Sequence, residues 1–528
     1  MTIAAPITLA STMADRVGLL WPELLLLAAA MVVALMGLSK DRTIRGAVGP
    51  VSILAVLASG LLALFTGGAD AAAAAGVPFP ALAQWLKPMV ALIAAGLMAV
   101  QGGFVDQALE AAIGRNAAAF NPLRAIRGEF HAFALFSIAG VMLLTTATDL
   151  IWIFLALELV SLPTYVMVAI GRGDRPGLEA AVKYFFLGAM ATAIMLMGFA
   201  LLYGATGSLQ LDLIQNAFGA QAATGGIALL GVGGLMLASV GLFFKITAVP
   251  MHFYAPDVYE GAPLPVTAFL SFIPKVAGFV GLILVLGTAG LTAGELPRPI
   301  IALLWMAAIL TMSLGNMGAL LQRSMKRTMA YSSIAHSGYM LVALAAGTTD
   351  ALDALLFYLF AYGVTTVATF GGLAVIQRAG GDADRFEDLA GLRRTHPWAT
   401  AMIVLGALSF TGIPPLLGFF GKFWILTSAF EAGQIALCVF LVVNSLVSAR
   451  YYLRFMATPV VAEPDSNATP TERNPSLAPV LASVAFGLAL LVLPCFTGSI
   501  FGWVQRATDP AMGAAASAPA AAQSADSR

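Results

Sequence analysis

The chain has 528 residues, of which 60% are hydrophobic and only 10% charged, and its mean hydropathy is +0.90. This composition excludes a water-soluble domain of this size, because a soluble surface needs many more polar side chains. Lys and Arg (27) balance Asp and Glu (27), so no net charge favours a nucleic-acid partner. The composition predicts an all-α integral membrane protein.

Apolar runs follow one another along almost the whole chain. A bilayer core of about 30 Å takes roughly 20 apolar residues per helix, and fourteen runs of about that length are present. In chain order they cover approximately residues 17 to 38, 45 to 66, 81 to 101, 130 to 147, 150 to 170, 181 to 204, 226 to 250, 265 to 288, 299 to 317, 327 to 346, 354 to 377, 399 to 421, 433 to 455 and 477 to 499. We therefore expect about fourteen transmembrane helices.

The charges of the loops predict an orientation, because Lys and Arg near span ends are retained in the cytoplasm. The even-numbered loops hold Arg298 alone, whereas the odd-numbered loops hold eighteen such residues: Lys40, Arg42, Arg45, Arg115, Arg124, Arg127, Arg172, Arg175, Arg323, Lys326, Arg327, Arg378, Arg385, Arg393, Arg394, Arg450, Arg454 and Arg473. Both termini are thus expected on the periplasmic side. The seventh loop is the exception, since it is acidic around Asp257 and Glu260.

Five lysines remain in or beside the apolar runs, namely Lys87, Lys183, Lys245, Lys275 and Lys422. Lys87 lies near the end of its run, where a long side chain can reach the interface, so we assign it no role. A lysine at the centre of a membrane helix costs roughly 2.5 to 3.5 kcal/mol to insert. Lys245 and Lys275 stand well inside their runs, which predicts that they face a protein interior or a water-filled path.

Glu158 is the one carboxylate that we place well inside a predicted span, and Lys183 lies near the start of the next span. The two side chains could form an ion pair that only fixes helix packing, or one that moves protons. Burial disfavours the charged form of an amine and a neighbouring carboxylate favours it, so a change in such a pair would load and release a proton.

Prolines lie close to three of these lysines: Pro250 follows Lys245, Pro274 precedes Lys275, and Pro414 and Pro415 precede Lys422. A proline interrupts the hydrogen bonds of a helix. Broken helices at membrane depth line polar cavities and mark ion sites in transporters. An ordinary kink beside a lysine that reaches the interface is the alternative.

His336 lies within a predicted span, in the segment Ser333 to Tyr339. A histidine has an ordinary pKa of about 6.5, so one inside a span can relay protons. We predict this role for His336. The alternative is a core histidine whose ring nitrogens are merely hydrogen-bonded.

Several segments together resemble the antiporter-like subunit N of respiratory NADH-quinone oxidoreductase, complex I. The resemblance is most specific from Phe243 through His252 and Ala255 to Pro263, continuing to Pro274 and Lys275. It extends in the same order over four further segments, Asp149 to Pro163, Tyr331 to His336, Phe386 to Leu392 and Gly418 to Phe423.

The resemblance implies fourteen helices, in which helices 4 to 8 and 9 to 13 form inverted repeats with broken helices 7 and 12. The expected regions are three N-terminal helices with a cytoplasmic loop (1–129), a first repeat (130–290), a second repeat (299–455), a loop and last helix (456–500), and a disordered Ala-rich tail (501–528). An insertion around residues 105 to 128 is expected to bear on no site.

The resemblance also implies a proton path. Glu158 and Lys183 would be the paired carboxylate and lysine, Lys245 and Lys422 the charged residues of the two broken helices, and Lys275 the central lysine, with His336 between. Protons would move from cytoplasm to periplasm across a bacterial inner membrane, coupled to NADH oxidation and quinone reduction in other subunits.

No cofactor is expected on this chain, because nothing in it resembles a four-cysteine cluster site, a nucleotide-binding glycine loop or a haem motif. FMN, iron-sulfur clusters and quinone are expected on other subunits of the complex. The expected partners are other membrane subunits and lipid. Two alternatives remain, a subunit of a multi-subunit Na⁺/H⁺ antiporter and a membrane scaffold whose lysines merely pair.

Overall fold

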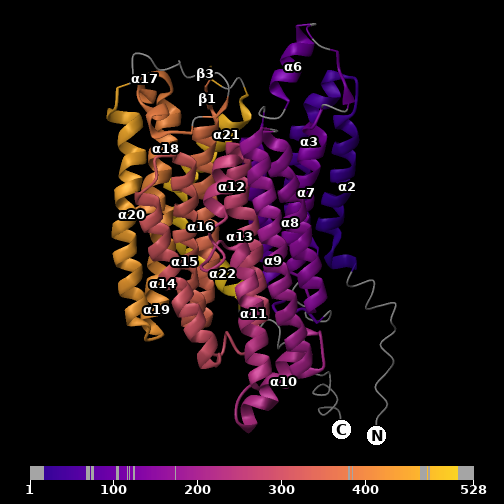
Figure 1. Ribbon diagram of the computed structural model, residues 1–528, viewed down its shortest axis with the longest axis vertical. Coiled ribbons are helices and arrows are strands. Elements are labelled where there is room, and N and C mark those ends of the chain that lie inside the picture. The colour runs from indigo at the N-terminus through magenta and orange to yellow at the C-terminus, as the bar shows by residue number, and fades with distance from the viewer. Residues whose placement is uncertain are drawn as a thin grey trace, which may run out of the picture.

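The chain folds into a bundle of long helices that run roughly parallel to one another (Figure 1). The computed structural model describes residues 17 to 508 except 67–71, 73–75, 103–105, 116, 118, 123–124, 173, 379–380, 383, 464–471 and 474–475. Three strands of two or three residues form a small sheet at one end of the bundle. The predicted all-α architecture is confirmed.

A helix or a helix pair coincides with each predicted apolar run. In chain order these are α2 (Trp21–Gly37), α3 (Arg42–Phe65), α5 (Leu82–Val100), α7 (Arg127–Leu144), α8 (Leu150–Arg172), α9 (Arg175–Thr206), α11 (Leu229–Lys245) with α12 (Ala255–Gly261), α13 (Leu264–Gly287), α14 (Arg298–Leu320), α15 (Met325–Ala346), α16 (Thr349–Ala374), α18 (Pro397–Thr411) with α19 (Leu417–Glu431), α20 (Ile435–Val461) and α21 (Ala478–Val492). Among the described residues, ten helical segments are long and apolar enough to cross a membrane. The number fourteen stays a prediction.

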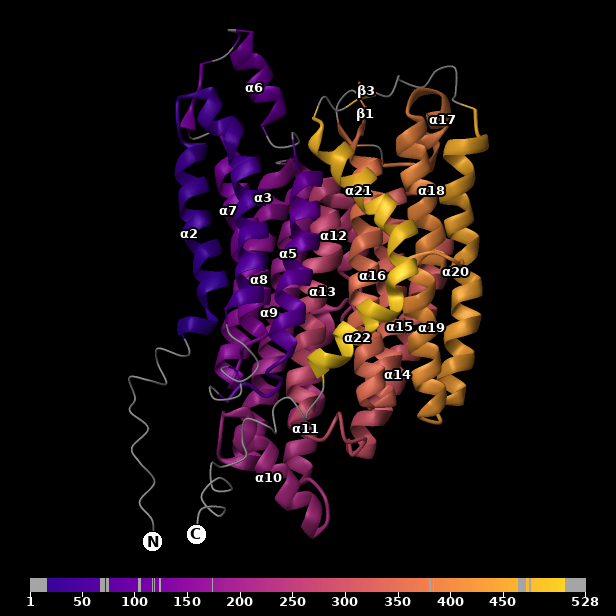
Figure 2. The same cartoon turned by 180° about the vertical axis from the view of Figure 1, so that it is seen from behind.

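The two ends of the bundle carry different elements (Figures 1 and 2). At one end lie α6 (Gln107–Gly114), η2 (Phe386–Leu389), α17 (Leu392–Thr395) and a sheet in which β1 (Ile376–Arg378) pairs with β2 (Gly381–Asp382) and β3 (Glu472–Arg473). At the other end lies α10 (Leu211–Thr224), and α2 begins and α22 (Thr497–Thr508) ends toward it. The loops predicted to be cytoplasmic therefore share the first end.

Helix α10 was not expected. Its 14 residues are too few for a span, and only Leu211, Ile214 and Phe218 are buried. This spacing of three and four residues is the narrow apolar stripe of a helix that lies on a surface, so a search for long apolar runs passes over it.

Two helices at the centre of the bundle are buried along their length. Every residue of α16 from Ala351 onward is buried, and so is every residue of α13 except the last. Pro274 lies inside α13 without interrupting it, so the expected break beside Lys275 is wrong. Packing on all sides keeps the helix continuous where the missing N–H of the proline removes only one hydrogen bond.

The other two expected breaks are present. Helix α11 ends at Lys245, and the chain turns through Thr247, which has a φ of 58°, before α12 begins. A positive φ is strained for a β-branched residue, so the surrounding contacts hold this turn in place. Helix α18 ends at Thr411 and is capped by Gly412, whose φ of 86° suits glycine, and α19 begins beyond the two prolines.

The N-terminal helices correct one further expectation. Lys87 does not reach the interface: its side chain is buried in α5, pairs with the equally buried Glu23 of α2 at 2.7 Å and donates to the carbonyl of Leu19 at 2.9 Å. Two carboxylates, Glu23 and Asp353 of α16, are more deeply buried than Glu158, although neither lies well inside its helix. Both acids lie near helix starts, where the sequence resembles an ordinary span boundary.

The predicted insertion around residues 105 to 128 is attached to the first loop. Arg45 is buried and donates to Glu110 of α6 at 2.7 and 3.2 Å, and to the carbonyls of Ser39 and Lys40 at 2.9 Å each. The guanidinium beside Glu110 lowers the pKa of that carboxyl from its ordinary value. The insertion is thus held by a charged clamp.

Part of the expected tail is helical. Residues 501 to 508 belong to α22, which packs against α16 and α5, so the disordered tail does not begin at residue 501. Residues 509 to 528, the rest of that prediction, lie outside the described residues.

Candidate functional site: buried lysines on a hydrogen-bonded chain

The break after α11 places Lys245 against a carboxylate. Its Nζ donates to Ser161 Oγ at 2.5 Å and lies 3.8 Å from Glu158 Oε1, with both partners on α8. Glu158 also accepts from Thr192 Oγ1 of α9 at 2.9 Å. Lys245 is buried and Glu158 is partly buried, so this ion pair lies in a medium where its electrostatic interaction is much stronger than in water.

The expected pair of Glu158 with Lys183 is wrong. Lys183 is 42% exposed and binds Glu179 and Asp257, each at 2.9 Å. Glu179 precedes it by one helical turn on α9, and this spacing of four residues is visible in the sequence as a local ion pair. Lys183 therefore belongs to the end of the bundle rather than to its interior.

Around Lys183 lies a cluster of opposite charges. Asp257 also accepts from Arg327 at 2.9 Å, and Arg327 donates to Glu260 at 2.8 Å. An open cavity of about 340 Å³ is lined by residues of this cluster: Glu179, Lys183, Asp257, Glu260 and Asp384 with Pro176, Ala180 and Gly261. The acidic seventh loop is thus neutralised by basic residues of neighbouring elements.

Lys275, in the wholly buried α13, has no carboxylate partner within the described part of the chain. Its Nζ donates to the carbonyl and to Oγ of Ser333 on α15, at 2.5 and 2.8 Å, and lies 4.8 Å from the centre of the Tyr362 ring. Tyr362 in turn donates to Ser333 Oγ at 3.0 Å. A carbonyl, a hydroxyl and an aromatic face take the place of a counter-ion.

One serine connects the surroundings of Lys245 and Lys275. Ser337 donates both to the carbonyl of Ile246, the residue after Lys245, and to the carbonyl of Ser333 at 3.3 Å. Because Ser333 is the partner of Lys275, α15 bridges the broken helix and the central lysine.

His336 lies on the same helix between two tyrosines. Its Nδ1 is 2.6 Å from the hydroxyl of Tyr358 and its Nε2 is 2.8 Å from that of Tyr452. Tyr452 also hydrogen-bonds to Ser332. A neutral imidazole donates with one nitrogen and accepts with the other, so this arrangement suits a group through which a proton passes.

Lys422 lies at the second break. It is buried, donates to the carbonyl of Thr411, the last residue of α18, at 3.0 Å, and lies 4.7 Å from the centre of the Tyr339 ring. Its stem packs on Gly412. No carboxylate pairs with it among the described residues. The exposed C-terminal carbonyls of a helix favour a cation in this position.

Beyond Tyr339 the hydrogen bonds continue toward α20. The Tyr339 hydroxyl accepts from Asn316 at 2.9 Å, and Tyr451 donates to the same amide at 3.0 Å. Asn316 and Asn444 are linked as well, at 3.1 Å. Lys422 thus lies beside a network that joins α14, α15 and α20.

Sequence reasoning missed the neutral side chains that contact the buried lysines and His336. These are chiefly Ser161, Ser333, Tyr358, Tyr362 and Tyr452. Serine and tyrosine are common in membrane helices, so their residue types alone do not mark them. Their one signal is spacing, because Ser333 and Ser337 lie on the same face of the helix, each close to His336.

The fold and these side chains define a polytopic membrane protein of the class that buries several lysines and a histidine in its interior, each with its own hydrogen-bond partners. The family model described as "NADH:quinone oxidoreductase/Mrp antiporter, TM" matches residues 147–448. The chain belongs to this family, which confirms the resemblance found in the sequence.

Named relatives and solved structures agree with that assignment. "NADH-quinone oxidoreductase subunit N 1" of Solibacter usitatus is 40% identical over 71% of this chain and 75% of its own length. A chain of respiratory complex I from Thermus thermophilus is 31% identical, with a TM-score of 0.67 over 90% of this chain and 98% of that one. The Mrp complex of Dietzia sp. DQ12-45-1b contains a chain with a TM-score of 0.75 over 96% of this chain and 99% of that chain, but at 20% identity it shows the fold alone.

Proposed function

We propose that this chain is the proton-translocating membrane subunit of an NADH-quinone oxidoreductase. The observation that carries the proposal is the set of four buried proton-binding groups, Lys245, Lys275, His336 and Lys422, each within hydrogen-bonding distance of a hydroxyl or carbonyl oxygen. Groups as costly to bury as these mark ion or proton pathways in membrane proteins. The relatives named subunit N support the same function.

The proposed path begins at the charged end. Protons enter through the cavity beside Lys183, which is a mouth residue in this scheme, and reach Lys245. Glu158 sets the proton affinity of Lys245 through their ion pair. The proton then passes to Lys275 and His336 by way of Ser333 and the tyrosines, and leaves past Lys422.

The loop charges give the orientation of the chain, and the direction of transport, from cytoplasm to periplasm, is the one that the family implies. The arginine-rich end is assigned to the cytoplasm of a bacterial cell and the α10 end to the periplasm, with both termini periplasmic. The driving reaction, NADH oxidation and quinone reduction, takes place on other subunits that carry FMN and iron-sulfur clusters. This chain has only two cysteines, too few for a four-cysteine cluster of its own.

Replacement of the paired lysine tests the proposal. We expect Lys245→Ala to abolish quinone-linked proton pumping by the complex reconstituted in vesicles, because the path loses its first buried proton-binding group. Lys40→Ala is the matched control, since this exposed loop lysine lies outside the bundle interior. A normal number of protons per NADH in Lys245→Ala contradicts the proposal.

The second candidate is a subunit of a multi-subunit Na⁺/H⁺ antiporter, favoured by the fold shared with the Mrp complex. The two functions differ in what drives the protons. Sodium-dependent proton exchange by the native complex, in the absence of NADH and quinone, supports the antiporter.

A further inference from the structure

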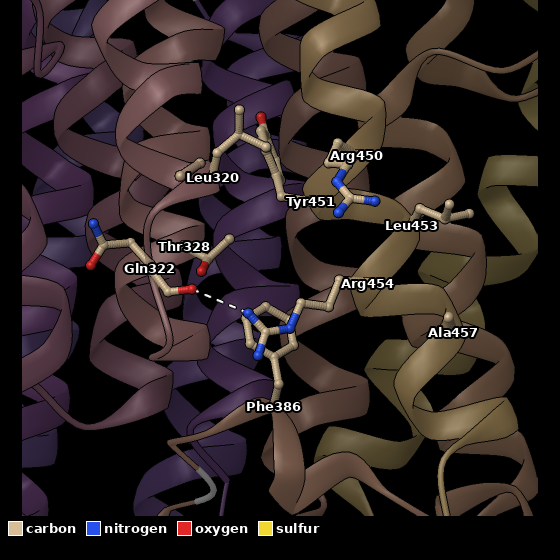
Figure 3. A pocket seen from close by; sticks show the side chains of 10 residues that line it. Leu320, Gln322, Thr328, Phe386, Arg450, Tyr451, Leu453, Arg454 and Ala457 are labelled. Atoms are coloured by element: carbon tan, nitrogen blue, oxygen red, sulfur yellow. Dashed lines mark hydrogen bonds between the residues drawn. The ribbon is translucent and has the colours of Figure 1, made fainter.

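A second cavity lies at the arginine-rich end of the bundle, away from the row of lysines. It encloses about 340 Å³ between the end of α14, the start of α15, η2 and α20 (Figure 3). Its lining consists of Ala319, Leu320, Gln322, Thr328, Phe386, Arg450, Tyr451, Leu453, Arg454 and Ala457. The lining combines cationic, hydroxyl and apolar groups and includes no carboxylate.

Two arginines supply the charge of this cavity. Arg450 and Arg454 are four residues apart on α20, so they project from successive turns on one face of the helix. The Arg454 guanidinium stacks 4.1 Å from the centre of the Phe386 ring and donates to the carbonyl of Gln322 at 3.2 Å. Its nearest acidic group, Glu387, lies 3.5 Å away and is mostly exposed. Arg454 is therefore held in a defined position at the cavity wall.

Arg450 is different, because it is exposed and forms no hydrogen bond or ion pair with any residue that the structure describes. Arg323, one residue beyond the lining Gln322, is likewise exposed and has no partner within that described part. The cavity is thus lined by one fixed and one unpaired cation and by no carboxylate, and Arg323 adjoins its lining in the sequence. A planar guanidinium binds phosphate oxygens in pairs, which makes arginine well suited to a phosphate group.

The outer faces of the two helices that border the cavity are apolar and uncovered. Leu321 is 81% exposed, Leu446 71% and Leu453 58%, and Leu314, Met317 and Leu320 are exposed as well. They lie on α14 and α20, the two helices that border the cavity, or directly after α14. An amphiphile whose head lay between the arginines would have this apolar surface beside its chains.

We propose that this cavity binds an anionic phospholipid of the cytoplasmic leaflet. The phosphate lies between Arg450 and Arg454, and an acyl chain lies against the exposed apolar faces of α14 and α20. Basic pockets between membrane helices on the cytoplasmic side are suited to anionic headgroups. Both parts of the ligand are matched, because the cations line the cavity, and Leu314, Met317 and Leu446 are exposed on the same two helices at positions that precede the cavity residues. An acidic surface of a protein partner would match the arginines alone.

The test uses the full-length chain in lipid nanodiscs or mild detergent. Bound lipid is counted by native mass spectrometry after addition of phosphatidylglycerol or phosphatidylcholine with the same acyl chains. We expect one phosphatidylglycerol to bind in preference, and the preference to fall by about fivefold for each arginine that is replaced in Arg450→Gln and in Arg450→Gln/Arg454→Gln. Arg450→Gln alone breaks no hydrogen bond or ion pair within the described part of the chain, so it keeps the test valid if the double variant fails to fold.

Two further variants sharpen the result. Arg450→Lys retains the charge and is expected to keep most of the preference, while Arg393→Gln/Arg394→Gln removes two exposed cations of α17 at the same end and is expected to leave it unchanged. Equal binding of both lipids by the unmodified chain overturns the proposal, as does an unchanged preference in Arg450→Gln.

Two other outcomes also overturn it. If millimolar inorganic phosphate displaces the bound lipid from the unmodified chain, the site is one for free phosphate. If Arg450→Gln releases a neighbouring subunit from the purified complex while lipid binding stays unchanged, the cavity faces a protein.

Discussion

The two broken helices hold their lysines in different ways. At the first break, Lys245 faces the carboxylate of Glu158 at 3.8 Å and the hydroxyl of Ser161. At the second break, Lys422 faces the carbonyl of Thr411 and the ring of Tyr339, without a carboxylate among the described residues. One half of the molecule compensates a buried cation with a full charge, and the other with dipoles.

This difference implies different electrostatic control in the two halves. A carboxylate within 4 Å stabilises the charged form of a lysine much more than a carbonyl does, so Lys245 is the residue whose protonation responds to a movement of its partner. Lys422 responds instead to the positions of the helix ends and of the network around Tyr339. We therefore expect the half around Lys245 to be the one that is switched, and the half around Lys422 to conduct protons without a paired carboxylate.

The largest expected effect is on the free energy of unfolding, which the same replacement is expected to change in opposite directions at Lys245 and at Lys422. Lys245→Met leaves Glu158 without its cation and is expected to destabilise the protein by about 3 kcal/mol, because a broken buried pair leaves an uncompensated charge. Lys422→Met removes a cation that has no counter-ion and is expected to be neutral or to stabilise by about 1 kcal/mol. Thermal midpoints of the purified variants in the same detergent measure both. If both replacements destabilise equally, the contrast between the halves is wrong.

A smaller effect tests proton conduction in the half around Lys422. His336→Gln is expected to keep hydrogen-bonding capacity toward Tyr358 and Tyr452 while losing the ability to exchange a proton. Quinone-linked pumping in vesicles should fall by about tenfold or more, with stability changed by less than about 1 kcal/mol. Tyr358→Phe is the companion variant that removes one of these contacts. Pumping at the normal rate in His336→Gln assigns this histidine to packing.

A third, still smaller effect tests whether the ion pairs of Lys183, which solvent reaches, matter less for pumping than the interior pair of Glu158 and Lys245. Lys183→Ala removes bridges to Glu179 and Asp257 that solvent reaches, so its cost is expected to be about 1 kcal/mol or less. Pumping is expected to change by about twofold at most, since Asp257 still binds Arg327. Glu158→Gln, assayed in parallel, is expected to reduce pumping much more. Similar losses in the two variants contradict the distinction.

The smallest effect concerns the ion pair between Glu110 and Arg45. This pair lies at one end of the bundle, whereas the pair of Glu158 and Lys245 lies inside it. The pKa of Glu110 is lowered by its hydrogen bond from Arg45. The contribution of this carboxylate is therefore complete above its ordinary pKa of 4.5 and is lost as pH falls through the lower, folded-state value. Hydrogen exchange of α6 is expected to speed up over that acidic range by an amount that corresponds to about 1 kcal/mol or less. Glu110→Gln should show no such pH dependence, and an identical profile in this variant rules out the clamp as its cause.

The polar groups of the site divide by how visible they are in a sequence. Lys245, Lys275 and Lys422 could be found because a cation in an apolar run is rare, and His336 because it lies within one. The pairing of these groups could not be predicted. Glu158 and Lys245 are far apart in the chain and meet only when α8 packs near α11 and α13. The wrong pairing of Lys183 has the same origin: adjacency of two predicted spans says nothing about which faces meet.

What the sequence by itself determined is the membrane class, the position of the spans and the family, because a bilayer accepts only long apolar helices and the family segments are local strings of residues. What only the tertiary structure decided is how each buried charge is compensated. Glu23 meets Lys87, Glu158 meets Lys245, and Lys275 meets a serine. The physical reason is that compensation depends on distances of a few ångströms between side chains on different helices, and helix packing alone sets those distances.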